Sequence, residues 1–168
     1  MQRRAVHSHI ITAHYGLPLM VARRRGLLVE VTDGVGYGYR GNAFYSLAKV
    51  SAIHLTEALA RELRPHGVTC VALTPGFLRS EAMLDRFGIT EANWRDAVKQ
   101  DPHFAASETP FFIGRAVVAL AVAPIVSARS GQTLTTWDLA EEYGFTDVDG
   151  TRPNWGRHFA QHVQRADR

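Results

Sequence analysis

Hydrophobic positions along the chain repeat in two ways, and the two patterns predict helices alternating with buried strands. Apolar side chains recur at three- and four-residue steps over residues 5–22 and again over 42–63, which is the spacing of one helix face. The stripe of the second helix consists of Ala48, Ala52, Leu55, Leu59 and Leu63. Residues 27–31, an apolar run broken only by Glu30, and residues 68–73 predict two short strands. Strand, long helix and strand form a βαβ unit, so we expect parallel strands with a right-handed crossover.

Beyond the second strand the pattern is less regular, and shorter elements are expected. They are helices at 80–87, 91–100 and 108–122, a strand at 131–134, a helical turn at 138–143, a turn at Asp149-Gly150 and a helix from about Trp155. Thr90 is the expected cap of the second of these helices. Near the start of the chain, Pro18 is expected to perturb the first helix, and Gly26 to stop it. No repeat or linker divides the chain, so we predict one α/β domain, or part of one, over residues 1–168.

Composition and charge narrow the class of protein. Hydrophobic residues make up 46% and charged residues 21% of 168 positions, which is ordinary for a globular domain. The single cysteine, Cys70, lies in an apolar run, is expected to be a buried thiol, and suits a reducing cytoplasm. No apolar run reaches the roughly 20 residues of a membrane helix, and no signal peptide is evident, so we expect a cytoplasmic protein. The net charge is +3 and basic residues are scattered except at Arg23–Arg25, so no nucleic-acid partner is expected.

The candidate chemistry lies around the first strand and the helix that follows it. Tyr45 and Lys49 are four residues apart on the first turns of that helix, so both should point to one face. A phenol beside a cation can exchange a proton near neutral pH. Thr32 ends the strand 13 positions before Tyr45, where its hydroxyl could hold a carbonyl or alcohol oxygen. Pro75-Gly76 follows the second strand, and ligands of open α/β sheets bind at such carboxyl ends. These residues indicate carbonyl–alcohol redox chemistry.

Other motifs are less convincing. Gly36-Tyr-Gly38-Tyr-Arg-Gly41 matches the G-x-G-x-x-G dinucleotide fingerprint, but its loop is long and the second strand ends without the acidic residue that binds ribose. Histidines occur at 7, 9 and 14 and at 158 and 162, without carboxylates at ligand spacing, so no metal site is predicted. No G-x-S-x-G motif of a hydrolase nucleophile is present in the sequence.

Three longer segments complete the pattern. They are Arg64-Pro-His-Gly-Val-Thr-Cys-Val-Ala-Leu-Thr-Pro-Gly-Phe77, Ser130-Gly-Gln-Thr-Leu134 and Asp138-Leu-Ala-Glu-Glu-Tyr-Gly-Phe-Thr-Asp-Val-Asp-Gly150. With Tyr45 and Lys49, they resemble the C-terminal half of the short-chain dehydrogenase/reductase family, from Val6 to about Pro153. The last segment is similar to the dehydrogenase/reductase SDR member 1-like branch of that family. The resemblance implies a Rossmann-type parallel sheet with flanking helices.

The resemblance also implies a function and a role for each site residue. The function is hydride transfer between a nicotinamide cofactor, NAD or NADP, and a carbonyl or alcohol substrate. Tyr45 would be the general acid/base, Lys49 would favour the ionised phenol and bind the nicotinamide ribose, and Thr32 would orient the substrate oxygen in place of the family's Ser. The residues that would contact the cofactor after the second strand are Pro75, Gly76, Leu78 and Ser80. The helices at 5–22 and 42–63 would form the interface of a homo-oligomer.

The departures from the family leave alternatives open. Its glycine-rich T-G-x-x-x-G-x-G loop and the residue that selects NAD or NADP would precede residue 1, so we expect a fold truncated at the N-terminus. Ala5 stands near the position of the helical Asn that completes the family's catalytic tetrad. One hypothesis is an oxidoreductase, and a second is a non-catalytic remnant that serves as an oligomerisation or interaction module. A third is that the true protein is longer, through a misplaced start codon or a split gene.

Overall fold

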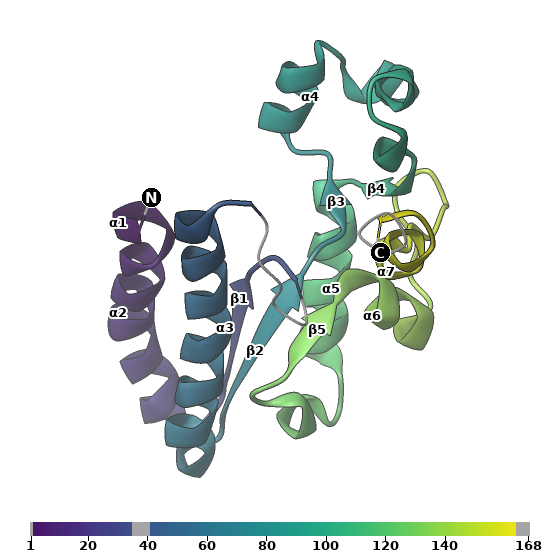
Figure 1. Ribbon diagram of the computed structural model, residues 1–168. Coiled ribbons are helices and arrows are strands. Elements are labelled where there is room, and N and C mark those ends of the chain that lie inside the picture. Colours follow the sequence, from purple (N-terminus) through teal and green to yellow (C-terminus); the bar gives the residue numbers. More distant parts are fainter. Residues whose placement is uncertain (1, 35–40, 164–168) are drawn as a thin grey trace. The chain divides into compact units, whose positions relative to one another are not determined.

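The computed structural model describes residues 2–34 and 41–163, and the chain forms two compact units (Figure 1). The first comprises Met1–Thr74 and Leu120–Leu134, and the second comprises Pro75–Ala119 and Thr135–Arg168.

A three-stranded sheet with the order β1-β2-β5 is the centre of the first unit. β1 (Gly26–Val31) and β2 (Val68–Thr74) pair in parallel, with register from Gly26 opposite Val68 to Val31 opposite Leu73. β5 (Thr133–Thr135) is the neighbour of β2 on its other side. Every residue of β2 is buried, as its mainly apolar sequence predicts. Both predicted strands and their parallel pairing are confirmed.

Two long helices, α2 (His7–Arg23) and α3 (Ala43–Leu63), lie side by side next to this sheet (Figure 1). The residues of their common core are Ala13 and Leu17 of α2, Ala60 and Leu63 of α3, and Val68 and Cys70 of β2. The prediction of α3 is confirmed to within one residue. The short 3-10 helices η1 (Arg64–His66) and η4 (Val126–Arg129) complete the unit.

The predicted first helix differs from the structure at both ends. It is divided into α1 (Gln2–Ala5) and α2 at Val6, whose ψ of −53° is paired with a φ of −125°. Pro18 lies within α2, and the helix ends at Arg24, which adopts a left-handed conformation with φ of 51°. Gly26, the predicted stop, instead opens β1. A glycine is needed there because a Cβ would lie 2.5 Å from Met20 Sδ.

The second unit is built from short elements around aromatic side chains. Its strands β3 (Phe77–Leu78) and β4 (Ser107–Glu108) pair in parallel over two residues each. Its helical elements are α4 (Glu81–Phe87), η2 (Glu91–Lys99), η3 (Pro102–Ala106), most of α5 (Pro110–Val122), α6 (Thr136–Tyr143), α7 (Trp155–His158) and the π-helix η5 (Phe159–Val163). Phe104 is fully buried, with its ring centroid 5.2 Å from that of Phe77 and 5.0 Å from that of Phe87.

Two helix predictions in this unit need correction. The segment predicted as a helix over 91–100 is the 3-10 helix η2, with a kink at Asn93, although its predicted cap Thr90 forms a capping box with Asn93. The helix predicted to begin at residue 108 begins at Pro110, because Ser107 and Glu108 pair with β3. Proline is favoured at the first position of a helix, where its missing N–H has no helical partner to lose.

Candidate functional site

The start of α3 places Tyr45 and Lys49 next to each other. Asn42 caps this helix, and its side-chain oxygen accepts a hydrogen bond from Tyr45 N at 3.0 Å. Tyr45 is therefore held in the first turn, and Lys49 follows one turn later. Lys49 Nζ lies 5.6 Å from the centroid of the Tyr45 ring, within the range of a cation–π contact. The structure brings this predicted pair together.

Thr32, the third predicted catalytic residue, is fixed to the backbone of the same helix. Its residue is 2% exposed, and its Oγ1 donates to the carbonyl oxygen of Lys49 at 2.9 Å. This bond ties the end of β1 to the second turn of α3. Thr32 Oγ1 could accept from an alcohol while it keeps this bond, but to donate to a carbonyl oxygen it would have to break it.

The side chain that reaches the Tyr45 hydroxyl is Asp33, which the sequence analysis missed. Tyr45 Oη donates to Asp33 Oδ2 at 2.7 Å, and the carboxylate is only partly buried. The two residues beside Asp33 are both held: Thr32 by its bond to α3, and Gly34 by a bond from its N–H to Thr74 Oγ1 at 2.9 Å. The available signal was an acidic residue directly after a strand, 12 positions before Tyr45. A phenol hydrogen-bonded to a carboxylate can exchange its proton with that carboxylate or with a bound oxygen.

Part of the loop between β1 and α3 lies outside the described residues. Tyr37 and Tyr39 fall there. So do Gly36 and Gly38 of the fingerprint-like sequence, and that interpretation stays untested.

The predicted cofactor-contacting residues belong to the second unit. Pro75 and Gly76 form the turn before β3, Leu78 ends that strand, and Ser80 is the residue before α4. Gly76 N donates to Glu108 Oε2 at 2.9 Å. A Cβ at Gly76 would lie 2.6 Å from Trp155 Cβ, so only glycine fits this turn without a shift of its neighbours. Thr32, Tyr45 and Lys49 thus lie in the first unit, and these four residues in the second.

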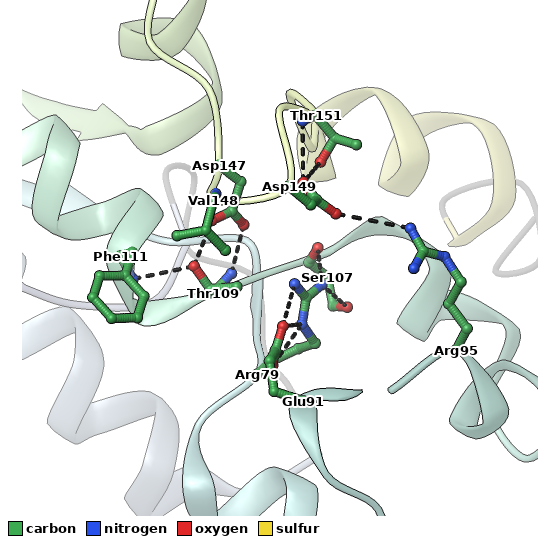
Figure 2. A network of polar contacts seen from close by, with 10 residues as sticks. All are labelled: Arg79, Glu91, Arg95, Ser107, Thr109, Phe111, Asp147, Val148, Asp149 and Thr151. Carbon is green, nitrogen blue, oxygen red and sulfur yellow. Dashed lines mark hydrogen bonds and ion pairs between the residues drawn. The ribbon is translucent and has the colours of Figure 1, made fainter. Parts of the chain in front are cut away.

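A buried arginine organises the residues beside this turn (Figure 2). Arg79 is 3% exposed, and its guanidinium donates to both carboxylate oxygens of Glu91 and to the backbone and side-chain oxygens of Ser107. Its guanidinium carbon lies 4.1 Å from the ring centroid of Trp94. These bonds satisfy the buried charge, and they hold Ser107 in place.

Two aspartates of the segment before α7 complete this network (Figure 2). Asp147 accepts from Thr109 N at 2.8 Å and from Thr109 Oγ1 at 2.5 Å. Asp149 accepts from Thr151 and lies 3.8 Å from Arg95. The hydrogen bond from the Thr151 hydroxyl, assisted by the charges of Arg79 and Arg95, lowers the pKa of Asp149.

The remaining titratable groups that the sequence analysis considered have other roles. Cys70 is fully buried, and burial, with a smaller effect of Glu30, raises the pKa of its thiol to about 11, so it is no nucleophile at neutral pH. His9 Nδ1 pairs with the buried Glu30 of β1. His103 Nδ1 and His158 Nε2 are 3.0 Å apart, and burial, followed by His162 and His103, lowers the pKa of His158. Within residues 2–34 and 41–163, no cluster suits a metal ion, and no helix is both long and apolar enough to cross a bilayer.

Comparison with known proteins gives a consistent set of relatives. Residues 2–88 match the short chain dehydrogenase family. Dehydrogenase/reductase SDR family member 1 of Mus musculus is 37% identical over 147 residues, which cover 86% of this chain and 47% of the relative. Its Homo sapiens counterpart is 36% identical over 146 residues, with the same coverage of 86% and 47%. The chain therefore spans about half the length of the curated relatives it matches. The predicted resemblance is confirmed.

Solved structures support the fold. A short chain dehydrogenase/reductase family protein superposes with a TM-score of 0.62 at 28% identity, covering 78% of this chain and 52% of that one. A gluconate 5-dehydrogenase from Burkholderia cenocepacia J2315, in complex with NADP and tartrate, also gives a TM-score of 0.62, at 18% identity and with 80% and 52% coverage. The predicted α/β fold with a parallel sheet is confirmed, and the chain again matches about half of each structure.

Proposed function

The chain belongs to the short-chain dehydrogenase family, and on that basis we propose that it carries the proton-transfer half of an NAD(P)-dependent oxidoreductase site. The reaction is hydride transfer between a nicotinamide cofactor and a carbonyl or alcohol. The observation that carries this proposal is the contact of Tyr45 with both Lys49 and Asp33 at the start of α3.

Tyr45 is the proposed proton donor for carbonyl reduction. When bound, the nicotinamide cofactor supplies a hydride to the carbonyl carbon. The carbonyl oxygen, as it gains negative charge, takes the proton of Tyr45 Oη, and the product is an alcohol. The ammonium of Lys49 stabilises the phenolate left behind, because opposite charges at this range favour the ionised form. A proton from solvent then restores the phenol, and alcohol oxidation follows the same steps in reverse.

Asp33 is the proposed partner of that proton. Its carboxylate accepts from Tyr45 Oη at 2.7 Å, so the phenol must turn its proton from Asp33 to the substrate oxygen before the transfer. Because Asp33 is partly exposed, it can exchange a proton with water and return it to Tyr45. Thr32 positions the pair by fixing the backbone of Lys49.

Several residues would hold the reacting end of the cofactor. Lys49 would bind the nicotinamide ribose, and the turn at Pro75-Gly76, with Leu78 and Ser80, would line the nicotinamide ring. In the first unit, the ammonium of Lys49 and the phenol of Tyr45 are polar groups that suit a hydroxylated sugar. Separate binding measurements with NADH and with NADPH decide between the two cofactors.

The decisive test compares the chain with its Tyr45→Phe variant. We expect consumption of NADH or NADPH with a panel of aldehydes and ketones, and a decrease in kcat of about 100- to 10,000-fold in the variant, because the general acid is lost. Titration calorimetry with NADH and with NADPH tests the cofactor separately. Binding of neither cofactor, or equal turnover by both proteins, would contradict the proposal.

A second candidate function, an oligomerisation module, is favoured by apolar side chains on α2 and α3. Tyr15 and Leu19 are 74% and 66% exposed, and the exposed Ile11 lies one turn before Tyr15 on α2. On α3, Phe44, Leu47 and Val50 are also exposed. Apolar stripes on adjacent helices are typical of an interface, and we propose a second copy of this chain as the occupant.

Light scattering tests this module without reference to catalysis. We expect the chain to be a dimer or larger at micromolar concentration, and Tyr15→Glu with Leu19→Glu to produce monomers, because a buried unpaired carboxylate opposes association. A strictly monomeric wild-type chain would argue against the module and leave the oxidoreductase proposal as it is.

A further inference from the structure

Glu108 is a carboxyl group buried without a charged partner bound to it. The residue has no exposed surface. Its Oε2 accepts from Gly76 N at 2.9 Å and from Thr136 Oγ1 at 2.8 Å. Its Oε1 has no hydrogen-bond partner among the residues that the structure describes. One oxygen of this carboxyl group therefore accepts two hydrogen bonds, and the other accepts none from the described residues.

The residues on both sides of Glu108 are held by hydrogen bonds. Ser107 accepts two from the Arg79 guanidinium, and Thr109 donates two to Asp147 (Figure 2). The carbonyl oxygen of Glu108 itself accepts from Arg79 N at 2.8 Å. A side chain on so fixed a segment has little freedom to follow a moving partner, so it can set the position of that partner.

The partner is the Pro75-Gly76 turn. Gly76 N is fixed by Glu108 Oε2, and a Cβ at Gly76 would lie 3.0 Å from that oxygen and 2.6 Å from Trp155 Cβ. The Glu108 carboxyl and the Trp155 side chain therefore both lie against this turn.

The pKa of the Glu108 carboxyl lies near neutrality. Burial raises the pKa of this carboxyl to about 7, although the hydrogen bonds from Gly76 and Thr136 lower it. The charged groups that act on it from neighbouring segments are Asp147, which raises the pKa, and Arg79, which lowers it. The bond from Gly76 favours the ionised form, so by linkage ionisation must strengthen that bond.

We propose that Glu108 is a positioning residue for the Pro75-Gly76 turn, with Oε2 holding Gly76 N–H while Oε1 gains and loses a proton, so that the hold on the turn changes with the ionisation. This inference rests on the proposed function in one respect, because it is that function which assigns the Pro75-Gly76 turn to nicotinamide binding. The hydrogen bond and its change with ionisation do not depend on a bound cofactor.

Nuclear magnetic resonance of the labelled chain between pH 4 and 9 tests the proposal. We expect the side-chain carboxyl carbon of Glu108 and the amide proton of Gly76 to shift together, with a common midpoint near 7 instead of the 4.5 of an ordinary glutamate. In Glu108→Gln the Gly76 shift should disappear. In Glu81→Gln, which changes an exposed glutamate of α4, it should remain.

Thr136→Val gives a second, milder test that leaves the carboxyl in place. Removal of one hydrogen bond that favours the ionised form should move the Glu108 midpoint upward. A Glu108 midpoint near 4.5, or a Gly76 amide that does not follow Glu108, would overturn the proposal. If Gly76 follows Glu108 but neither NADH nor NADPH perturbs the Gly76 resonance, the proposed function fails while the positioning of the turn by Glu108 is supported.

Discussion

Asp33 and Glu108 occupy equivalent places in the two units, and they differ in one physical respect. Each is the middle residue of three whose flanking residues are held by side-chain hydrogen bonds: Thr32 and Gly34 around Asp33, Ser107 and Thr109 around Glu108. Each accepts a hydrogen bond from a residue of the proposed site, Tyr45 or Gly76. Asp33, however, is partly exposed, whereas Glu108 is completely buried.

Because they differ in exposure, the two carboxyl groups are suited to different roles. Water around Asp33 can deliver and remove protons, so this group can take part in each turnover. Burial of Glu108 excludes water and disfavours its charge, so it suits a slow adjustment to pH and the support of a backbone turn. On the two proposals above, the same local construction would serve proton exchange in one unit and positioning in the other.

The largest expected effect that separates the two groups is on stability against pH. Because the pKa of Glu108 is raised from 4.5 to about 7 by folding, its contribution to stability is fully present below about 4.5 and is lost as the pH rises through 7. The difference corresponds to about 3 kcal/mol, at about 1.4 kcal/mol for each unit of pKa. We expect the free energy of unfolding, measured with urea, to fall by this amount from pH 4.5 to 8 relative to Glu108→Gln.

Controls for this measurement use groups that lack the burial. Glu81→Gln should keep the wild-type pH dependence, because Glu81 is exposed. Asp33→Asn should keep most of it as well, since Asp33 is only partly buried. If the free energy of unfolding changed with pH in the same way in the wild type and in Glu108→Gln, the proposed difference between Glu108 and Asp33 would be wrong.

The next effect is kinetic and concerns Asp33. Asn at this position can still accept a hydrogen bond from Tyr45 Oη, but it cannot take up a proton. We expect Asp33→Asn to lower kcat for carbonyl reduction about tenfold, or about 1.4 kcal/mol, with little change in KM. The measurement is kcat and KM from initial rates of the wild type and the variant. An unchanged kcat would mean that Asp33 only orients the phenol.

The parts of the fold and site that could be predicted from the sequence depend on short separations. β1, α3 and β2 follow from mainly apolar runs and a helical stripe, and Tyr45 meets Lys49 because four residues make about one turn. Asp33 is 12 residues from Tyr45, but it lies past the end of β1, where Thr32 and Asp33 both bond to α3 and the alternation of a strand does not say which atom of α3 each one reaches.

The rest could not be predicted because it depends on long separations without periodicity. β3 and β4 are two residues long, too short to show any alternation. Gly76 and Glu108 are 32 residues apart, and nothing near Gly76 in the sequence indicates a carboxyl partner. Arginine side chains are usually exposed, but Arg79 is buried because Glu91 and Ser107 accept hydrogen bonds from its guanidinium.

The smallest expected effect compares two asparagine caps, one in each unit. Asn42 caps α3 by accepting from Tyr45 N at 3.0 Å, and Asn154 caps α7 by accepting from Arg157 N at 2.9 Å. Replacement of either by Ala should lower the free energy of unfolding by about 1 kcal/mol, because a helix-end N–H loses its partner. Only Asn42→Ala should also lower kcat, since the amide it frees belongs to Tyr45. Asn42→Asp, which still accepts that bond, should restore both quantities, and urea unfolding together with initial rates measures them. If Asn154→Ala lowered kcat as much as Asn42→Ala does, the cap of α3 would be a support of the fold and not a means of placing Tyr45.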